Sequence, residues 1–179
     1  MPDASPVDVD QDGHVLILRI NRPESMNAIN GQVIADLTQA VKKARRNDSV
    51  RCLVLTGAPR ADGRPCFSAG DDLKEAAAGQ HPPGNPGNRL CNLLDDLLKP
   101  SIAVIDGVCT TGATELALAC DLRVVAHSAQ VSDWHLSRRL AGPLARNDGR
   151  ASLPCGGRTR ASFGWTISSP PLASVTIGQ

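Results

Sequence analysis

The sequence predicts an α/β domain, because short apolar runs typical of strands alternate with segments of helical character. Its 179 residues are enough for one domain with a core of its own. Hydrophobic residues make up 41 % and charged residues 21 % of the chain, as in ordinary globular proteins. Aromatic residues make up only 2 %, so we expect an aliphatic core and no stacked recognition of nucleic-acid bases.

The elements follow in order along residues 14–134. Apolar runs predict strands at residues 14–20, 50–56, 101–106, 122–126 and, as a further strand, 130–134. Helices are predicted at 31–46, from the small residues at 68–70 to about 78, at 89–98 and at 110–120. The segment 79–88, GQHPPGNPGN, is too rich in Pro and Gly for anything but a loop.

The helix at 31–46 has clear end signals. Asn30 can cap its start, and the basic residues Lys42, Lys43, Arg45 and Arg46 crowd its last turns, where they suit the helix dipole. We interpret this basic cluster as a solvated helix end.

Charge and residue usage exclude several classes of function. The net charge of +1 gives no basic field for nucleic acid or a membrane surface. None of the six Cys forms a C-x-x-C pair, and the four His lack metal-ligand spacing, so no metal site is predicted. The acidic N-terminal segment does not resemble a signal peptide, and no apolar run reaches membrane-spanning length. We therefore expect a cytoplasmic protein.

The composition changes after Ser137. Residues 138–179 contain six Arg, no Lys and one acidic residue, Asp148, with many Gly, Pro and Ser. We divide the chain into a folded core at 1–137 and an atypical tail at 138–179. Two explanations of the tail stay open: a disordered segment, or a change of reading frame near Ser137.

Two glycine-containing segments indicate where chemistry could occur. In FSAGDDLKE, residues 67–75, three small residues precede a segment of helical character. In CTTGATELALAC, residues 109–120, small residues again precede a helix. Small residues at a helix start permit a tight turn, and they also let a ligand approach the backbone closely.

Together with INRPESMNAIN near the N-terminus, these segments resemble the enoyl-CoA hydratase/isomerase (crotonase) superfamily, over residues 7 to 136. The three motifs occur in the order and at the spacing of that family. The resemblance implies a spiral of ββα units whose C-terminal part is missing or replaced by an irregular tail. It also implies homotrimers or hexamers, although the altered C-terminus puts that assembly, folding and ligand closure in question.

The resemblance implies chemistry on an acyl-CoA thioester through an enolate. The backbone N–H groups of Asp71 and Gly112 would hold the thioester oxygen, because preorganised donors stabilise developing negative charge. Family members often have a small residue at position 71, and the Asp71 carboxylate would be unhelpful beside an enolate unless it points away. In isolation, the segment 68–70 could equally be a plain turn.

Glu115 and His135 correspond to the two glutamates of the family's hydratases. Burial of Glu115 in an apolar helix would raise its pKa and suit proton transfer. The alternative is a glutamate placed at a helix start because the dipole favours it. His135 replaces the second glutamate; it could act as acid and base near neutral pH, or be a structural or surface histidine. Asp133 and Trp134 could shape the acyl pocket.

The resemblance also implies a coenzyme A cleft. Its contacts would come from Met26, Ala28, Ala69, Asp72 and Leu73. Coenzyme A would enter as part of the substrate, and no permanently bound cofactor is expected, since the chain has no phosphate-binding glycine loop of the ATP or NAD type.

Three hypotheses follow. The chain could be an enzyme of the enoyl-CoA hydratase/isomerase type, a catalytically inactive acyl-CoA-binding protein, or a truncated remnant of a frameshifted gene. The second hypothesis is motivated by the altered second glutamate and by the side chains of Thr111 and Ala113, where the family commonly has glycines. The third hypothesis is motivated by the tail.

Overall fold

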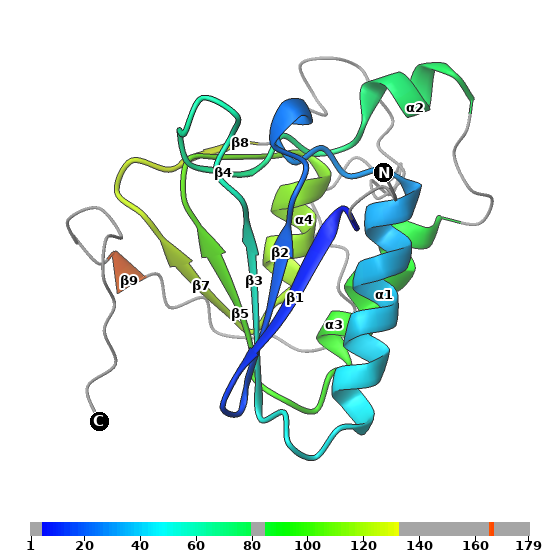
Figure 1. The fold of residues 1–179 in the computed structure, drawn as a ribbon, viewed down its shortest axis with the longest axis vertical. Coiled ribbons are helices and arrows are strands. Elements are labelled where there is room, and N and C mark those ends of the chain that lie inside the picture. The colour runs from blue at the N-terminus through cyan, green and yellow to red at the C-terminus, as the bar shows by residue number, and fades with distance from the viewer. Residues whose placement is uncertain (1–4, 80–84, 133–164, 167–179) are drawn as a thin grey trace, which may run out of the picture.

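The computed structural model of the chain describes residues 5–79, 85–132 and the strand at 165–166 (Figure 1). Two sheets form the framework, a large one with strand order β1-β2-β3-β5-β7-β9 and a small one with order β4-β6-β8. The large sheet consists of β1 Val7–Asp12, β2 Val15–Ile20, β3 Cys52–Gly57, β5 Ser101–Ile105, β7 Leu122–Val125 and β9 Trp165–Thr166. The small sheet consists of β4 Cys66–Ser68, β6 Val108–Thr110 and β8 Gln130–Ser132.

The centre of the large sheet is built by alternating aliphatic residues. In β2, Leu16, Leu18 and Ile20 are buried, and their neighbours in the strand are only partly buried. β2 pairs in parallel with β3, where Leu18 stands opposite Leu55. Only the β1–β2 pair is antiparallel among the described strand pairs.

Helices cover the large sheet on one side (Figure 1). They are α1 Gly31–Arg46, α3 Pro86–Asp95 and α4 Gly112–Ala119, with the shorter α2 Leu73–Ala77 and the 3-10 turn η1 Pro23–Ser25 at one end of the sheet. α3 contacts both α1 and α4, so the three longer helices form one layer. The core between this layer and the sheet is aliphatic, as predicted, with Phe67 as its one buried aromatic residue among those described.

The predicted N-cap of α1 is confirmed, and Lys43, Arg45 and Arg46 lie in its last turn, but the carbonyl groups there are bonded by Lys99, which was not predicted. The Asn30 side chain accepts a hydrogen bond of 2.9 Å from the Val33 N–H. At the other end, Lys99 Nζ donates to the carbonyl groups of Ala44 and Asn47, at 2.7 and 2.6 Å. A cation therefore satisfies the carbonyl end of the helix, as its dipole favours.

The chain order forms a spiral of ββα units. Each turn supplies one strand to the large sheet, then one strand to the small sheet, and then a helical segment. The first turn is β3, β4 and α2–α3, and the second is β5, β6 and α4. The third turn is described as far as its two strands, β7 and β8. All these strand pairs are parallel. The predicted α/β class and the ββα spiral are confirmed.

Several elements differ from the sequence prediction. The acidic strand β1 was not predicted, and neither were β4 and β6, because three-residue strands carry too little periodicity. β4 runs through Ser68, so α2 begins only at Leu73. α3 begins at Pro86, inside the predicted loop, because Asn85 caps it and a proline fits a first helical position.

The predicted tail contributes one described element. The two-residue strand β9 pairs in parallel with β7. The rest of residues 138–179 lies outside the described residues.

Candidate active site

The loops that carry the predicted site meet at the carboxyl ends of the central strands. β2 leads into η1, β3 leads into β4, and β5 leads into β6. Figure 1 shows η1, the small sheet and α2 at the same end of the large sheet. This is the usual position of ligand sites in parallel sheets.

The first predicted donor segment follows β4 and is fixed against the Met26–Ile29 loop. The Ala69 N–H donates to Met26 O at 2.9 Å, the Ile29 N–H to Gly70 O at 2.8 Å, and the Asp72 N–H to Ile29 O at 2.9 Å. The two segments therefore pair like short parallel strands, with an isolated bridge between Ile29 and Asp71.

The second predicted donor segment follows β6. Thr111 has φ 51° and ψ −123°, a conformation that is strained for a β-branched residue, and Gly112 then begins α4. The Thr111 N–H donates to Ser132 O at 3.2 Å, which ties the turn to the end of β8. The Thr110 hydroxyl donates to Ala69 O at 2.9 Å and joins the two donor segments.

The structure brings the two predicted donor residues together. Gly70 has φ +84°, and a Cβ atom there would lie 2.6 Å from Thr110 O and would collide with the Thr111 side chain. A Cβ atom on Gly112 would lie 2.7 Å from Asp71 Oδ1. The positive φ and the backbone contact therefore require glycine at position 70, whereas the atoms closest to position 112 belong to the Asp71 side chain. The Asp71 carboxylate does not point away from the donor pair; it lies against Gly112.

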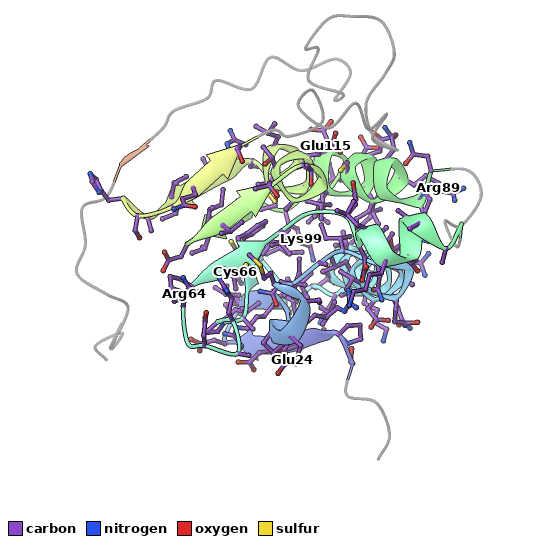
Figure 2. All side chains as sticks on the ribbon, turned by 90° about the horizontal axis from the view of Figure 1, so that it is seen from above. Glu24, Arg64, Cys66, Arg89, Lys99 and Glu115 are labelled. Carbon is purple, nitrogen blue, oxygen red and sulfur yellow. The ribbon has the colours of Figure 1, made fainter. Side chains whose placement is uncertain are left out.

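Glu115 lies one turn after Gly112 on α4, and Figure 2 labels it there. Its N–H donates to Thr111 O at 3.2 Å. The residue is half-buried and its Oε2 atom is buried. Residues three apart share a helix face, so the Glu115 side chain and Gly112 lie on the same side of α4.

His135, predicted as the partner of Glu115, lies outside the described residues, as do Asp133 and Trp134. The described chain reaches Ser132 at the end of β8. Ser132 O accepts hydrogen bonds from the Thr111 N–H and from the Thr114 hydroxyl, the latter at 3.3 Å.

Four of the five predicted coenzyme A contacts are joined in two pairs, one by a direct bond and the other through Arg22. Ala69 bonds to Met26 through the backbone, and Arg22 Nη1 bridges Ala28 O at 2.7 Å and Asp72 Oδ2 at 2.9 Å. The fifth, Leu73, follows Asp72 in the chain, and its side chain is half exposed.

Asp72 is the electrostatic centre of this cluster. Its carboxylate accepts hydrogen bonds from the N–H groups of Lys74 and Glu75, and so caps α2. Burial acts to raise its pKa, but the hydrogen bonds from Arg22 and from these N–H groups outweigh burial, so the pKa lies below the usual 3.8. The carboxylate is therefore ionised at neutral pH.

Two residues of the cluster were not singled out from the sequence. Asn27 is fully buried, and its side-chain N–H groups donate to Ala58 O at 2.7 Å and Cys66 O at 2.9 Å, while its Oδ1 accepts from the Arg22 N–H at 3.0 Å. Arg22 pairs with Asp72. Asn27, the last residue of NRPESMN, was a possible signal, since Asn tolerates the left-handed backbone of tight turns.

Burial disfavours the thiolate form of the described cysteines near the site. Burial raises the pKa of the Cys66 thiol, and it raises that of Cys109 to about 11. Both thiols are protonated near neutral pH, and a neutral thiol is a poor nucleophile.

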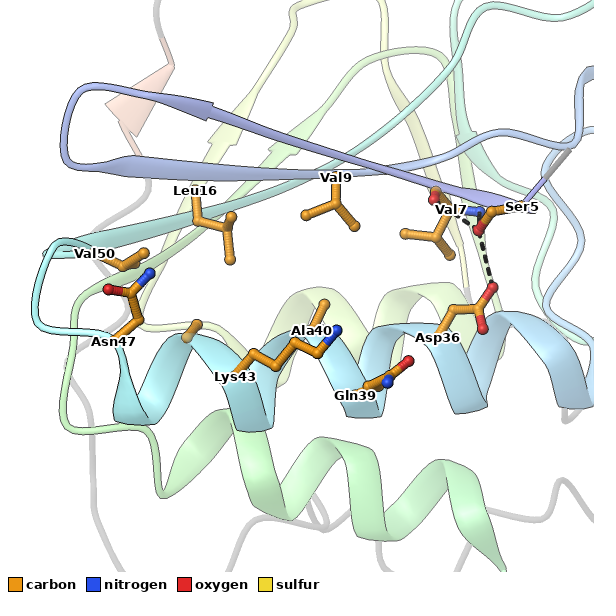
Figure 3. A pocket seen from close by; sticks show the side chains of 11 residues that line it. Ser5, Val7, Val9, Leu16, Asp36, Gln39, Ala40, Lys43, Asn47 and Val50 are labelled. Atoms are coloured by element: carbon orange, nitrogen blue, oxygen red, sulfur yellow. Dashed lines mark hydrogen bonds between the residues drawn. The ribbon is translucent and has the colours of Figure 1, made fainter.

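Figure 3 shows a separate cavity of about 350 Å³ between α1 and the β1–β2 hairpin. None of the predicted site residues lines it; its walls include Val7, Val9 and Leu16 from the hairpin and Ala40 and Lys43 from α1. Among residues 5–79 and 85–132, no group of three His, Cys, Asp or Glu could hold a metal ion. In the same part of the chain, no helix is long and apolar enough to cross a membrane.

Comparisons with known proteins agree with this geometry. The sequence profile of the enoyl-CoA hydratase/isomerase family matches residues 10–146. The chain is 33% identical over 157 residues to (E)-benzylidenesuccinyl-CoA hydratase of Thauera aromatica, covering 83% of this chain and 57% of the relative. It is 30% identical over 126 residues to short-chain-enoyl-CoA hydratase of Clostridium acetobutylicum, covering 68% and 47%.

The solved structures agree as well. The enoyl-CoA hydratase of Bacillus anthracis superposes with a TM-score of 0.69 at 28% identity, covering 77% of this chain and 54% of that one. The chain spans about half the length of these relatives. The profile match and the shared ββα spiral show that the chain belongs to the enoyl-CoA hydratase/isomerase family, the crotonase superfamily.

Proposed function

We propose that the chain binds an acyl-CoA thioester and stabilises its enolate with the backbone N–H groups of Asp71 and Gly112. The observation that carries this proposal is the contact between the two donor segments, in which the Asp71 side chain fills the space beside Gly112. In this proposal both N–H groups serve one oxygen atom, and losing either typically costs about 3 kcal/mol of transition-state stabilisation.

Glu115 is the proposed proton-transfer group. It shares a face of α4 with Gly112 and has a buried carboxylate oxygen. In hydration, a carboxylate takes the proton of a water molecule while oxygen adds to the β-carbon, and the electron pair moves to the thioester oxygen. A proton delivered to the α-carbon completes the addition; His135 is a candidate for that delivery.

The coenzyme A part of the ligand is proposed to lie against the Met26–Ala28 loop and the Ala69–Leu73 segment. Their mutual hydrogen bonds and the Arg22–Asp72 pair make this region preorganised. A preorganised surface binds without first ordering itself, which favours affinity.

The proposal is tested with purified protein, saturated butyryl-CoA for binding and crotonyl-CoA for turnover. Calorimetric titration is expected to give micromolar binding. Glu115→Gln is expected to retain the affinity within about threefold and to lower hydration of crotonyl-CoA by about a hundredfold or more, the usual contribution of an acid–base group. The exposed Asp48 provides the control, since Asp48→Asn removes one negative charge away from the site.

A second candidate function is acyl-CoA binding without catalysis. It is favoured by the Asp71 carboxylate against Gly112, where negative charge opposes an enolate. This candidate predicts butyryl-CoA binding, no hydration of crotonyl-CoA and no effect of Glu115→Gln. Measurable turnover that depends on Glu115 would exclude it, and absence of binding by the folded protein would exclude both candidates.

A further inference from the structure

The Asp71 side chain occupies the place where a side chain of residue 112 would be. A Cβ atom on Gly112 would lie 2.7 Å from Oδ1, 3.2 Å from Cγ and 3.4 Å from Oδ2 of Asp71. The whole carboxylate therefore lies along Gly112, at the first residue of α4. A side chain at position 112 would therefore require the Asp71 carboxylate to move.

Neighbouring segments fix the backbone at residue 71, which carries this carboxylate. The Gly70 turn, at φ +84°, and the bridge between Asp71 and Ile29 fix the direction of the chain at residue 71. In the described part of the chain, Thr111 forms no side-chain cap on α4. The partial positive charge at the start of a helix favours an anion there, and the Asp71 carboxylate lies at the start of α4.

We propose that Asp71 is a specificity-determining residue that makes the site select neutral acyl groups over acyl groups with a carboxylate next to the thioester carbonyl. The inference rests on the proposed function, in which the thioester oxygen is held by the N–H groups of residues 71 and 112. It concerns the side chain of Asp71, whereas the proposed oxyanion contact uses only its backbone.

The reason is the short distance between the carboxylate and any bound carbonyl group. The same residue would donate the N–H and carry the carboxylate, so an acyl carboxylate on the adjacent carbon comes within several ångströms of Asp71. Two like charges at such a distance near a protein surface repel strongly enough to weaken binding by a factor of about ten or more. A neutral acyl group of the same shape meets no such repulsion.

Malonyl-CoA and acetoacetyl-CoA are the probes, because they are nearly isosteric and differ by one charge. Dissociation constants are measured by calorimetric titration for the wild type, Asp71→Asn, Asp71→Ala and the control Asp48→Asn. Asn keeps the shape of Asp71 without its charge, and Ala keeps only the backbone donor. Asp48 is an exposed acid in the turn between α1 and β3, so its variant changes net charge equally away from the site.

We expect the wild type and Asp48→Asn to bind acetoacetyl-CoA at least about tenfold more tightly than malonyl-CoA. In Asp71→Asn and Asp71→Ala, the preference is expected to fall below about threefold, mainly through tighter malonyl-CoA binding. An unchanged preference in both Asp71 variants, with acetoacetyl-CoA still bound, would overturn this inference and leave the proposed function standing. No binding of either thioester by the folded wild type would overturn the proposed function and this inference with it.

Discussion

Replacing Asn27 by alanine removes the bonds that hold the Met26–Ala28 loop against β4. Three hydrogen bonds are lost: two from the side-chain N–H groups to Ala58 O and Cys66 O, and one from the Arg22 N–H to Oδ1. Ala58 and Cys66 are buried residues, so water is a poor replacement for the lost amide.

The expected loss of stability follows from these contacts. Each buried hydrogen bond contributes about 1 kcal/mol net, and leaving its partner unsatisfied adds to the loss. Asn27 also has φ 56°, a conformation that Asn tolerates better than Ala, by about 1 kcal/mol. We expect Asn27→Ala to lower the unfolding free energy by about 4 kcal/mol, and acyl-CoA binding to weaken because Met26 O no longer has a fixed position for the Ala69 N–H.

The assay is urea denaturation followed by far-UV circular dichroism, with three variants beside the wild type. Asn27→Gly loses the same bonds but tolerates the left-handed backbone, so it should recover only about 1 kcal/mol relative to Asn27→Ala. Asn92→Ala removes an exposed amide on α3 and should change the unfolding free energy by less than about 0.5 kcal/mol. A loss below about 1 kcal/mol in Asn27→Ala, or nearly full recovery in Asn27→Gly, would refute the reasoning.

Two further predictions concern the donor turns. Thr111→Gly is expected to raise the unfolding free energy by about 1 kcal/mol, because it removes a β-branched side chain from a residue at φ 51°. The control Ala113→Gly, in the helix that follows, should lower the unfolding free energy by about 1 kcal/mol. A lower thermal midpoint for Thr111→Gly than for the wild type would contradict this prediction. The pKa of Asp72 is lowered by its bonds to Arg22 and the start of α2, so the stability it contributes is present above pH 3.8 and is lost as the pH falls through the lower folded pKa. Urea denaturation between about pH 5 and pH 3 should therefore show that the unfolding free energy falls less with pH in Asp72→Asn than in the wild type. The same fall in both proteins would contradict the assignment of this pH dependence to Asp72.

The sequence by itself determined the elements whose signals are local. The helix at Gly31–Arg46 was predicted to the residue, because Asn30, the apolar stripe and the basic last turn all act within one segment. The strand pattern of β2 and the α/β alternation were readable for the same reason. The motif order predicted the family, and the close approach of backbone at Gly70 followed from the small residues of its motif.

Only the tertiary structure decided how these segments meet. The buried contacts of Asn27 reach residues 31 and 39 positions away, and the Arg22–Asp72 pair spans 50 positions, so no local pattern could reveal them. The contact of the Asp71 carboxylate with Gly112 joins the segments that follow β4 and β6, so it too arises only from packing. A sequence motif specifies which atoms are available, but the distance between atoms from different segments is fixed only when the sheets and helices pack together.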